Sequence, residues 1–95
     1  MQFVWDADKN RRNLAKHKIS FETAKLVFDD PFAISIRDQI VHGEERWQTM
    51  GLVGGIVVVL VAHTYTEEED DGVIRIISAR KATSHERRQY EQNRK

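Results

Sequence analysis

This sequence lacks several features that would crosslink a small domain, direct it to secretion or insert it into a membrane. It has no cysteine, which excludes disulfide bonds and thiolate metal sites, so the core must be stabilised by packing or by a partner. Its longest apolar run, residues 56–62, is far too short to cross a bilayer, and its first residues lack the apolar region of a secretory signal. These absences predict a soluble cytoplasmic protein, and the length of 95 residues predicts one domain, residues 1–95.

The formal net charge is zero, but the basic and acidic residues are distributed unevenly along the chain. Residues 9–18 contain basic charges and no acid, and residues 73–95 contain seven Lys or Arg against Glu86 and Glu91. The local field matters more than the total charge for binding a polyanion, so nucleic acid is not excluded. The densest acidic run, residues 67–71, is followed by Gly72, which is typical of an exposed hairpin tip.

Capping residues and apolar spacing predict a short first strand, two helices after it, a run of four strands and a final helix. Asp6 and Ser20 are the predicted N-caps of helices over about residues 7–17 and 21–28. Thr83 and Glu86 have capping-box spacing, which predicts a final helix over about residues 84–94. Strands are predicted at residues 3–5, 32–36, 46–53, 56–65 and 73–79. We therefore expect an α+β fold, with a mainly antiparallel sheet of four to five strands, two N-terminal helices and a C-terminal helix.

Two elements carry more specific expectations. The strand over residues 56–65 is predicted to be central, because residues 56–62 are apolar on both alternating faces. The preceding Gly54 and Gly55 predict a tight two-residue hairpin, since adjacent glycines supply positive φ angles. The final helix contains no large apolar residue except Tyr90. Because such a helix gains little from packing on its own domain, we expect it to dock on a partner or to fray.

Residues 73–90, VIRIISARKATSHERRQY, are the most informative stretch, because a β-branched strand runs directly into a cationic cluster. Four polar residues on or beside this strand could present positive charge to phosphate: Arg75, Ser78, Arg80 and Lys81. Regular alternation would put Ser78 and Arg80 on one face of the sheet and Arg75 on the other. Either a bulge intervenes, or Arg75 has a structural role such as pairing with a buried acid.

Three separated segments carry a family pattern in a fixed order. They are FVWDADKNRRNLAKHKISFETAKLVFDDP at residues 3–31, GEERW at residues 43–47, and VIRIISARKATSHERRQY at residues 73–90. Together they resemble the BrnT toxins of bacterial and archaeal type II toxin-antitoxin pairs. The resemblance implies a RelE-like fold, an endoribonuclease that inhibits translation, and a BrnA-like antitoxin with a ribbon-helix-helix domain. It also implies that operator DNA is contacted only through the antitoxin.

Metal-independent cleavage of RNA uses the neighbouring 2′-hydroxyl as the nucleophile. The protein must then position the backbone, neutralise charge on the phosphate and move protons, and arginine suits the second task because its planar fork binds two phosphate oxygens. The predicted catalytic residues are Arg46, Arg75, Ser78 and Arg80, and the predicted RNA-binding residues are Lys16, His17 and Lys81. We expect no cofactor and no metal, because no group of residues has metal-ligand spacing.

The group that moves the proton stays open at this point, because sequence spacing forces no pair of candidates together. The candidates are His17, His42, His63, His85, Tyr90, Glu44 and Glu45. For His17 the alternative role is to meet the negative end of the dipole of its helix. Without a clear general base, the rival hypothesis is a non-catalytic basic module that docks RNA or an acidic protein partner.

Overall fold

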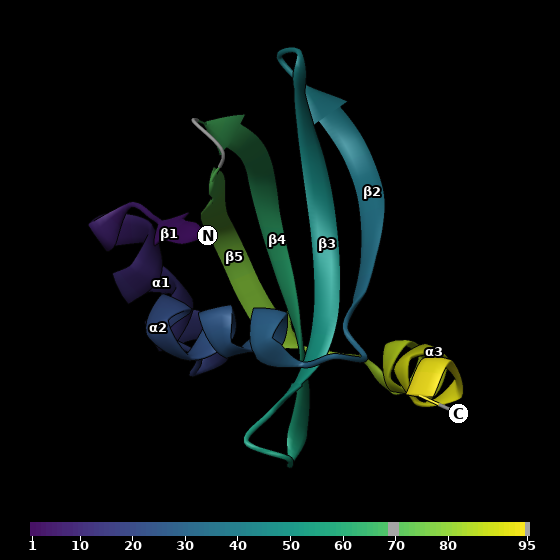
Figure 1. Ribbon diagram of the computed structural model, residues 1–95. Helices are drawn as coiled ribbons and strands as arrows, with labels where there is room; N and C mark the ends of the chain where they lie inside the picture. The colour runs from purple at the N-terminus through teal and green to yellow at the C-terminus, as the bar shows by residue number, and fades with distance from the viewer. Residues whose placement is uncertain (69–70, 95) are drawn as a thin grey trace.

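A single sheet forms the centre of the molecule, with helices at its sides (Figure 1). The computed structural model describes residues 1–68 and 71–94. The elements there are β1 (Gln2–Val4), α1 (Ala7–His17), α2 (Phe21–Ala24), the 3-10 helix η1 (Lys25–Asp29), β2 (Ile34–Val41), β3 (Glu44–Val53), β4 (Val57–Glu68), β5 (Asp71–Lys81) and α3 (Ser84–Arg94). The predicted α+β fold is confirmed. None of the described helices is long and apolar enough to span a membrane.

The sheet has the strand order β1-β5-β4-β3-β2, and β4 is its middle strand, as predicted. Strands β2 to β5 pair antiparallel with their neighbours in sequence, whereas the short β1 pairs parallel with β5. The pairing of β4 with β5 reaches Glu68 and Asp71, so these strands form a hairpin. Glu69 and Asp70, in the predicted acidic tip, lie outside the described residues.

Side-chain caps set the starts of the helices. The Asp6 carboxylate accepts a hydrogen bond from the Lys9 amide at 3.0 Å, and the Ser20 hydroxyl accepts one from the Thr23 amide at 3.1 Å. Both predicted N-caps are therefore confirmed. The second helix is less regular than predicted, because α2 continues as the 3-10 helix η1, which ends just before Asp30 and Pro31.

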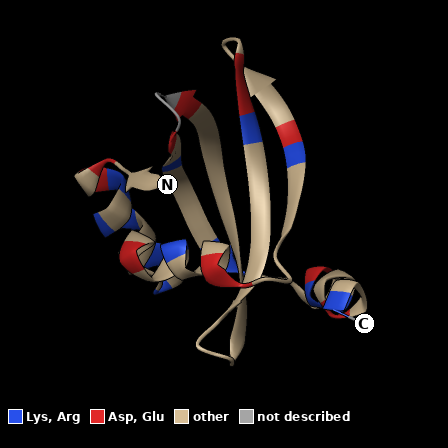
Figure 2. Cartoon of the chain, in the orientation of Figure 1, with Lys and Arg blue, Asp and Glu red and all other residues tan. Residues whose placement is uncertain are grey.

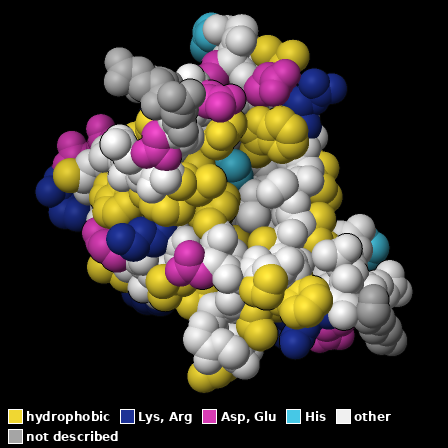
Figure 3. Space-filling view, in the orientation of Figure 1, with side chains coloured by type: hydrophobic (Ala, Val, Ile, Leu, Met, Phe, Trp, Pro, Cys, Tyr) yellow, Lys and Arg dark blue, Asp and Glu magenta, His cyan; other side chains and the backbone are white. Residues whose placement is uncertain are grey.

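The two faces of the sheet differ in how much of each is covered. We call the face beneath α1, α2 and η1 the helix-covered face, and Figure 1 shows these elements on the side of the sheet opposite α3. Hydrophobic side chains gather over this part of the molecule (Figure 3). The larger core lies here and contains Phe21, Ala24 and Val27 of the helical segment, packed on Val59, Val61, Ile74, Ile76 and Ala79 of the sheet.

We call the other face the open face; on β4 it carries Leu60, Ala62 and Thr64. Helix α3 covers only one end of it, through a second core formed by Met50, Val58, Leu60 and Tyr90. Tyr90 is 1% exposed, and its hydroxyl donates a hydrogen bond to the Asp30 carboxylate. Burial and this bond raise the pKa of Tyr90 to about 12. A single aromatic residue thus anchors the polar helix that the sequence predicted to dock or fray.

A β-bulge in β5 changes which residues share a face. Ala62 of β4 pairs with Ser78, but the next residue, His63, pairs with Ile76, so Ile77 is an extra residue in β5. Beyond the bulge, Arg75 pairs with Thr64, while Arg80 pairs with Leu60 on the near side. Residues 60, 62 and 64 alternate along β4, so their partners Arg80, Ser78 and Arg75 share the open face. The expectation from regular alternation, that Arg75 lies on the face opposite Ser78 and Arg80, is therefore wrong. The alternative with a bulge in this strand is correct.

The turn between β3 and β4 also differs from the prediction. Val53 pairs with Val57, so three residues, Gly54 to Ile56, connect the strands instead of two. Gly54 and Gly55 have φ angles of 63° and 71°, which explains the need for glycine at both positions. The third position is Ile56, predicted to begin the strand; it lies in the turn and is 89% exposed.

Candidate active site

All four predicted catalytic residues lie on the open face or at its edge. The bulge places Arg75, Ser78 and Arg80 there from β5. Arg46 joins them from β3, because its guanidinium and that of Arg75 approach the same carboxylate, that of Glu44. Figure 2 shows that charge gathers near the strand ends and on the helices, while the middle of β3 and β4 has none. The open face is thus an uncharged floor with arginines at its borders.

The Arg46, Glu44 and Arg75 side chains form the first group, which we call the arginine-glutamate cluster. Arg75 Nη2 lies 2.5 Å from Glu44 Oε1, and Arg46 Nε lies 3.6 Å from the same oxygen. Arg46 Nε is buried and has no hydrogen-bond partner among the described residues. One carboxylate therefore faces two guanidinium groups, which leaves a net positive charge to which an anion such as phosphate would be attracted.

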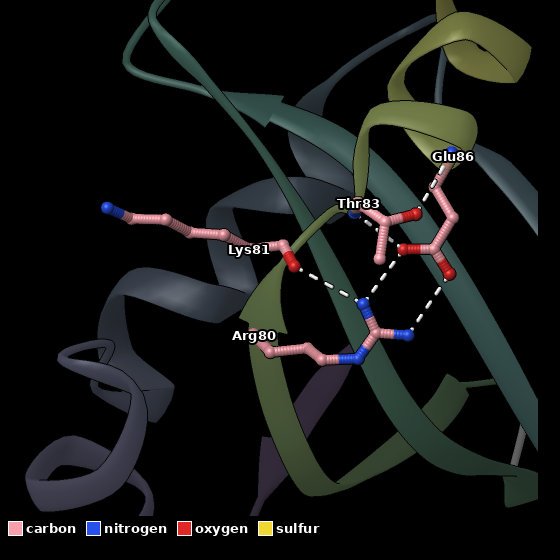
Figure 4. A network of polar contacts seen from close by, with 4 residues as sticks. All are labelled: Arg80, Lys81, Thr83 and Glu86. Carbon is pink, nitrogen blue, oxygen red and sulfur yellow. Dashed lines mark hydrogen bonds and ion pairs between the residues drawn. The ribbon is translucent and has the colours of Figure 1, made fainter.

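Arg80 belongs to a second group, in which its fork is already occupied (Figure 4). Arg80 Nη1 and Nη2 donate to the two Glu86 oxygens at 2.8 and 3.0 Å. Glu86 also accepts from the Thr83 amide at 2.9 Å, and the Thr83 hydroxyl accepts from the Glu86 amide at 3.2 Å, which confirms the predicted capping box. A phosphate could bind Arg80 in the same bidentate way only by displacing Glu86.

Arg75 and Arg80 are held by different carboxylates, Glu44 and Glu86. Arg75 and Arg80 are five residues apart on one strand, which separates their Cα atoms by roughly 15 Å. Ser78 lies between them, beside the free edge of β5, because β1 pairs only with residues 73–75. The predicted catalytic residues therefore share a surface, on which their arginines belong to two separately paired groups.

The Arg80–Glu86 pair makes α3 sensitive to acid. The Arg80 guanidinium is the main reason why the pKa of Glu86 falls from 4.5 to about 2. Below pH 4.5 the unfolded chain takes up the proton before the folded chain does, so stability should be full above about pH 4.5 and fall as the pH approaches 2. Because Arg80 is partly exposed, we expect this carboxyl to account for a loss of about 1 to 2 kcal/mol.

Urea unfolding between pH 2 and pH 7 measures this effect. The Glu86→Gln variant should lack the part of the acid dependence that Glu86 contributes. The Glu91→Gln variant removes an exposed carboxylate from the same helix and should follow the wild-type curve. Parallel curves for the wild type and Glu86→Gln would show that the ion pair contributes nothing to stability.

The predicted RNA-binding residues lie away from the arginines. Lys81 pairs with Val59, so it belongs to the helix-covered face, and Figure 4 shows its side chain extending away from Arg80. Lys16 and His17 lie in the last turn of α1. This position agrees with the alternative role of His17, in which it meets the negative end of the helix dipole. Both border a hollow of about 360 Å³ between α1 and the β5 edge, which is also lined by Lys9, Arg12 and Ser78. Ser78 thus connects this basic hollow with the open face.

Of the candidates for proton transfer, Glu44 is the one that the structure places between two of the predicted arginines. His63 is buried, its Nε2 lies 2.7 Å from Thr49 Oγ1, and burial lowers its pKa. Tyr90 is buried under α3, and Glu45 pairs with Arg37 at 3.4 Å. Within residues 1–68 and 71–94, no three His, Asp or Glu side chains gather as a metal site would require.

Sequence reasoning missed two residues that position the site. Asn13 of α1 is buried, and its side chain binds both backbone groups of Ala79 in β5, at 2.9 and 3.0 Å. Glu86 was recognised as a capping residue but not as the partner of Arg80. The pairing of Glu86 with Arg80 could have been predicted from the sequence, since a cap at the start of α3 must lie near the end of β5. The contact of Asn13 with Ala79 could not, because these residues are 66 positions apart.

Comparison with known proteins identifies the family and the fold of the chain. The sequence model of the family described as the ribonuclease toxin BrnT of type II toxin-antitoxin systems matches residues 5–86. The crystal structure of the Brucella abortus ribonuclease toxin BrnT superposes with a TM-score of 0.69 and 22% sequence identity, covering 88% of this chain and 99% of that chain. At this identity the structural similarity concerns the fold. No curated protein matches the chain. The match to the family extends over most of the sequence, and the chain therefore belongs to the BrnT family of ribonuclease toxins.

Proposed function

We propose that this protein is a metal-independent endoribonuclease that cleaves RNA in the cytoplasm and thereby inhibits translation. The observation that carries the proposal is the arginine-glutamate cluster, which combines two guanidinium groups and one carboxylate on an uncovered sheet face. As the toxin of a type II pair it has an antitoxin partner. We propose a BrnA-like antitoxin with a ribbon-helix-helix domain, through which the pair contacts operator DNA.

The proposed reaction requires only groups of the chain, the RNA and solvent water. The 2′-oxygen attacks the adjacent phosphorus and forms a bond to it, while Glu44 takes the 2′-hydroxyl proton. The bond from phosphorus to the 5′-oxygen breaks, and this oxygen takes a proton from solvent. Arg46 and Arg75 neutralise the charge that develops on the phosphate oxygens. The products are a 2′,3′-cyclic phosphate and a 5′-hydroxyl.

The remaining predicted residues would hold the RNA on either side of this point. From the cluster, the backbone would run along β5 past Ser78 and over the free edge into the basic hollow, where Lys16 and His17 lie. Positive side chains along such a path attract the phosphates regardless of sequence. Arg80 would contribute charge near α3, and Lys81 would contact the backbone from the helix-covered side.

The decisive experiment uses two substrates of the same sequence in EDTA, one RNA and one in which every sugar lacks the 2′-hydroxyl. We expect the purified chain to cut the RNA to products with 2′,3′-cyclic phosphate and 5′-hydroxyl ends and to leave the deoxy substrate intact. The ends can be identified by mass spectrometry. Cleavage of both substrates, or of RNA only after a divalent cation is restored, would contradict the proposed mechanism.

One observation favours a different function. Glu44, the candidate base, is itself held in an ion pair by Arg75 and approached by Arg46, so the face could bind RNA or a partner without performing chemistry. In that case the chain would be a basic module that docks RNA or an acidic protein. RNA that is retained in a gel-shift assay but is not cut under the conditions above would support this second function.

A further inference from the structure

A groove lies between α3 and the β3–β4 turn, at the end of the open face, away from the arginine-glutamate cluster. It has a volume of about 360 Å³. Its floor is apolar and includes Leu52, Ile56 and Val57, while α3 supplies a wall that contains Arg87, Arg88 and Arg94. We call it the α3 groove. Its lining combines an apolar strip with a cationic border.

The floor of the α3 groove exposes apolar surface that the fold leaves uncovered. Ile56 is 89% exposed because the three-residue turn lifts it out of β4. Leu52 on β3 is only half-buried, although it packs against the second core. Figure 3 shows hydrophobic side chains on the surface at this lower end of the molecule, over the β3–β4 turn. An exposed apolar strip of this kind with a polar rim is typical of a protein-binding surface.

The wall of the groove carries positive charge that the chain hardly compensates. Three arginines line the groove against one acid, Glu91. In the described part of the chain, neither Arg87 nor Arg88 has a carboxylate within 4.0 Å, and Arg87 Nη2 donates only to Ser84 Oγ, at 3.1 Å. Arg94 lies over the rings of Phe32 and Tyr90, at 5.5 and 5.9 Å from their centres. Acidic side chains of a partner would therefore meet free guanidinium groups here.

The groove is held in place, so its shape exists before any partner arrives. Tyr90 fixes the middle of α3 through its hydrogen bond to Asp30, and the Arg80–Glu86 pair fixes its first turn.

We propose that the α3 groove receives an acidic amphipathic segment of the antitoxin, with its apolar side chains on the floor and its carboxylates against the arginines. This inference rests on the proposed function, because it takes the antitoxin as the partner. RNA is the less suitable occupant. The floor residues are aliphatic, so they offer neither hydrogen-bond donors to phosphate nor aromatic rings on which bases could stack.

The test uses the absence of cysteine in this chain. An Ile56→Cys variant can be labelled at one position with a photo-crosslinker, and a Leu14→Cys variant on the exposed surface of α1 serves as the matched control. Each is mixed with the purified antitoxin of the pair, and the crosslinked peptide is identified by mass spectrometry. We expect crosslinks only from position 56, to a segment that contains both acidic and apolar residues.

A second measurement tests the charge. We expect the Arg87→Glu, Arg88→Glu double variant to weaken antitoxin binding at least tenfold in calorimetry, whereas the Arg11→Glu, Lys25→Glu control keeps the wild-type affinity. Unchanged affinity in the first variant, equal crosslinking from both positions, or crosslinks to added RNA would overturn the inference. RNA cleavage by the free variants is measured in parallel, and we expect wild-type rates. A different outcome is that neither the wild type nor any variant cleaves RNA, while antitoxin binding still follows the expected pattern. In that case the proposed function fails, but the docking surface stands.

Discussion

The Arg46→Ala variant is expected to cleave RNA about a hundredfold more slowly than the wild type, judged by kcat/KM. The variant removes one of two guanidinium groups aimed at the same charge, and loss of one preorganised electrostatic contact typically has an effect of this size. Arg75→Ala should behave similarly, with the added consequence that Glu44 loses its partner at 2.5 Å. Arg46→Lys should restore only part of the rate, since an ammonium keeps the charge but not the planar fork.

The matched control for Arg46 is Arg37→Ala. Arg37 also lies on a strand and also pairs with a glutamate, Glu45 at 3.4 Å, but it is on the helix-covered face. It should therefore leave cleavage unchanged. We expect Arg80→Ala to reduce the rate less than tenfold, because the fork of Arg80 is occupied by Glu86. A larger loss in Arg80→Ala than in Arg46→Ala would move the reaction centre from the cluster to the start of α3.

Glu44→Gln separates the proposed proton transfer from mere positioning of the arginines. Glutamine can still accept a hydrogen bond from Arg75 but cannot take the 2′-hydroxyl proton. If Glu44 is the base, the Glu44→Gln variant should lose cleavage of RNA altogether. If Glu44 only positions the arginines, Glu44→Gln should retain cleavage at a reduced rate.

The Asn13→Leu variant is expected to lose roughly 2 to 4 kcal/mol of the free energy of unfolding. Asn13 is 7% exposed, and its side-chain amide group binds the carbonyl of Ile19 and both backbone groups of Ala79. Leucine has similar volume but leaves all three backbone groups without these partners. Since a domain of this size has a total stability of about 5 to 15 kcal/mol, this is a large fraction.

Urea unfolding followed by circular dichroism measures this loss. Asn93→Leu is the control, because the Asn93 side chain is exposed and donates a hydrogen bond to the carbonyl of Phe32 at 3.2 Å. It should change the free energy by about 0.5 kcal/mol or less. Equal losses in the two variants would show that the Asn13 bonds are replaced by water at the free edge of β5.

The sequence alone determined the elements and the order in which they follow one another. The caps at Asp6, Ser20 and Thr83 were predictable because a capping side chain binds an amide only three residues away. The central position of β4 was predictable as well, because a strand that is apolar on both faces must be covered on both. Family membership was equally contained in the sequence, since the pattern extends over three separated segments.

The tertiary structure decided which of the functional residues lie together. Arg75 and Glu44 are 31 residues apart, and no local rule relates them. The extra residue at Ile77 is visible only in the pairing of β5 with β4, yet it moves Arg75 to the face of Ser78 and Arg80. Local structure depends on interactions between residues a few positions apart, so it can be read along the chain. The site depends on the register between remote strands, which is fixed only when the whole sheet packs.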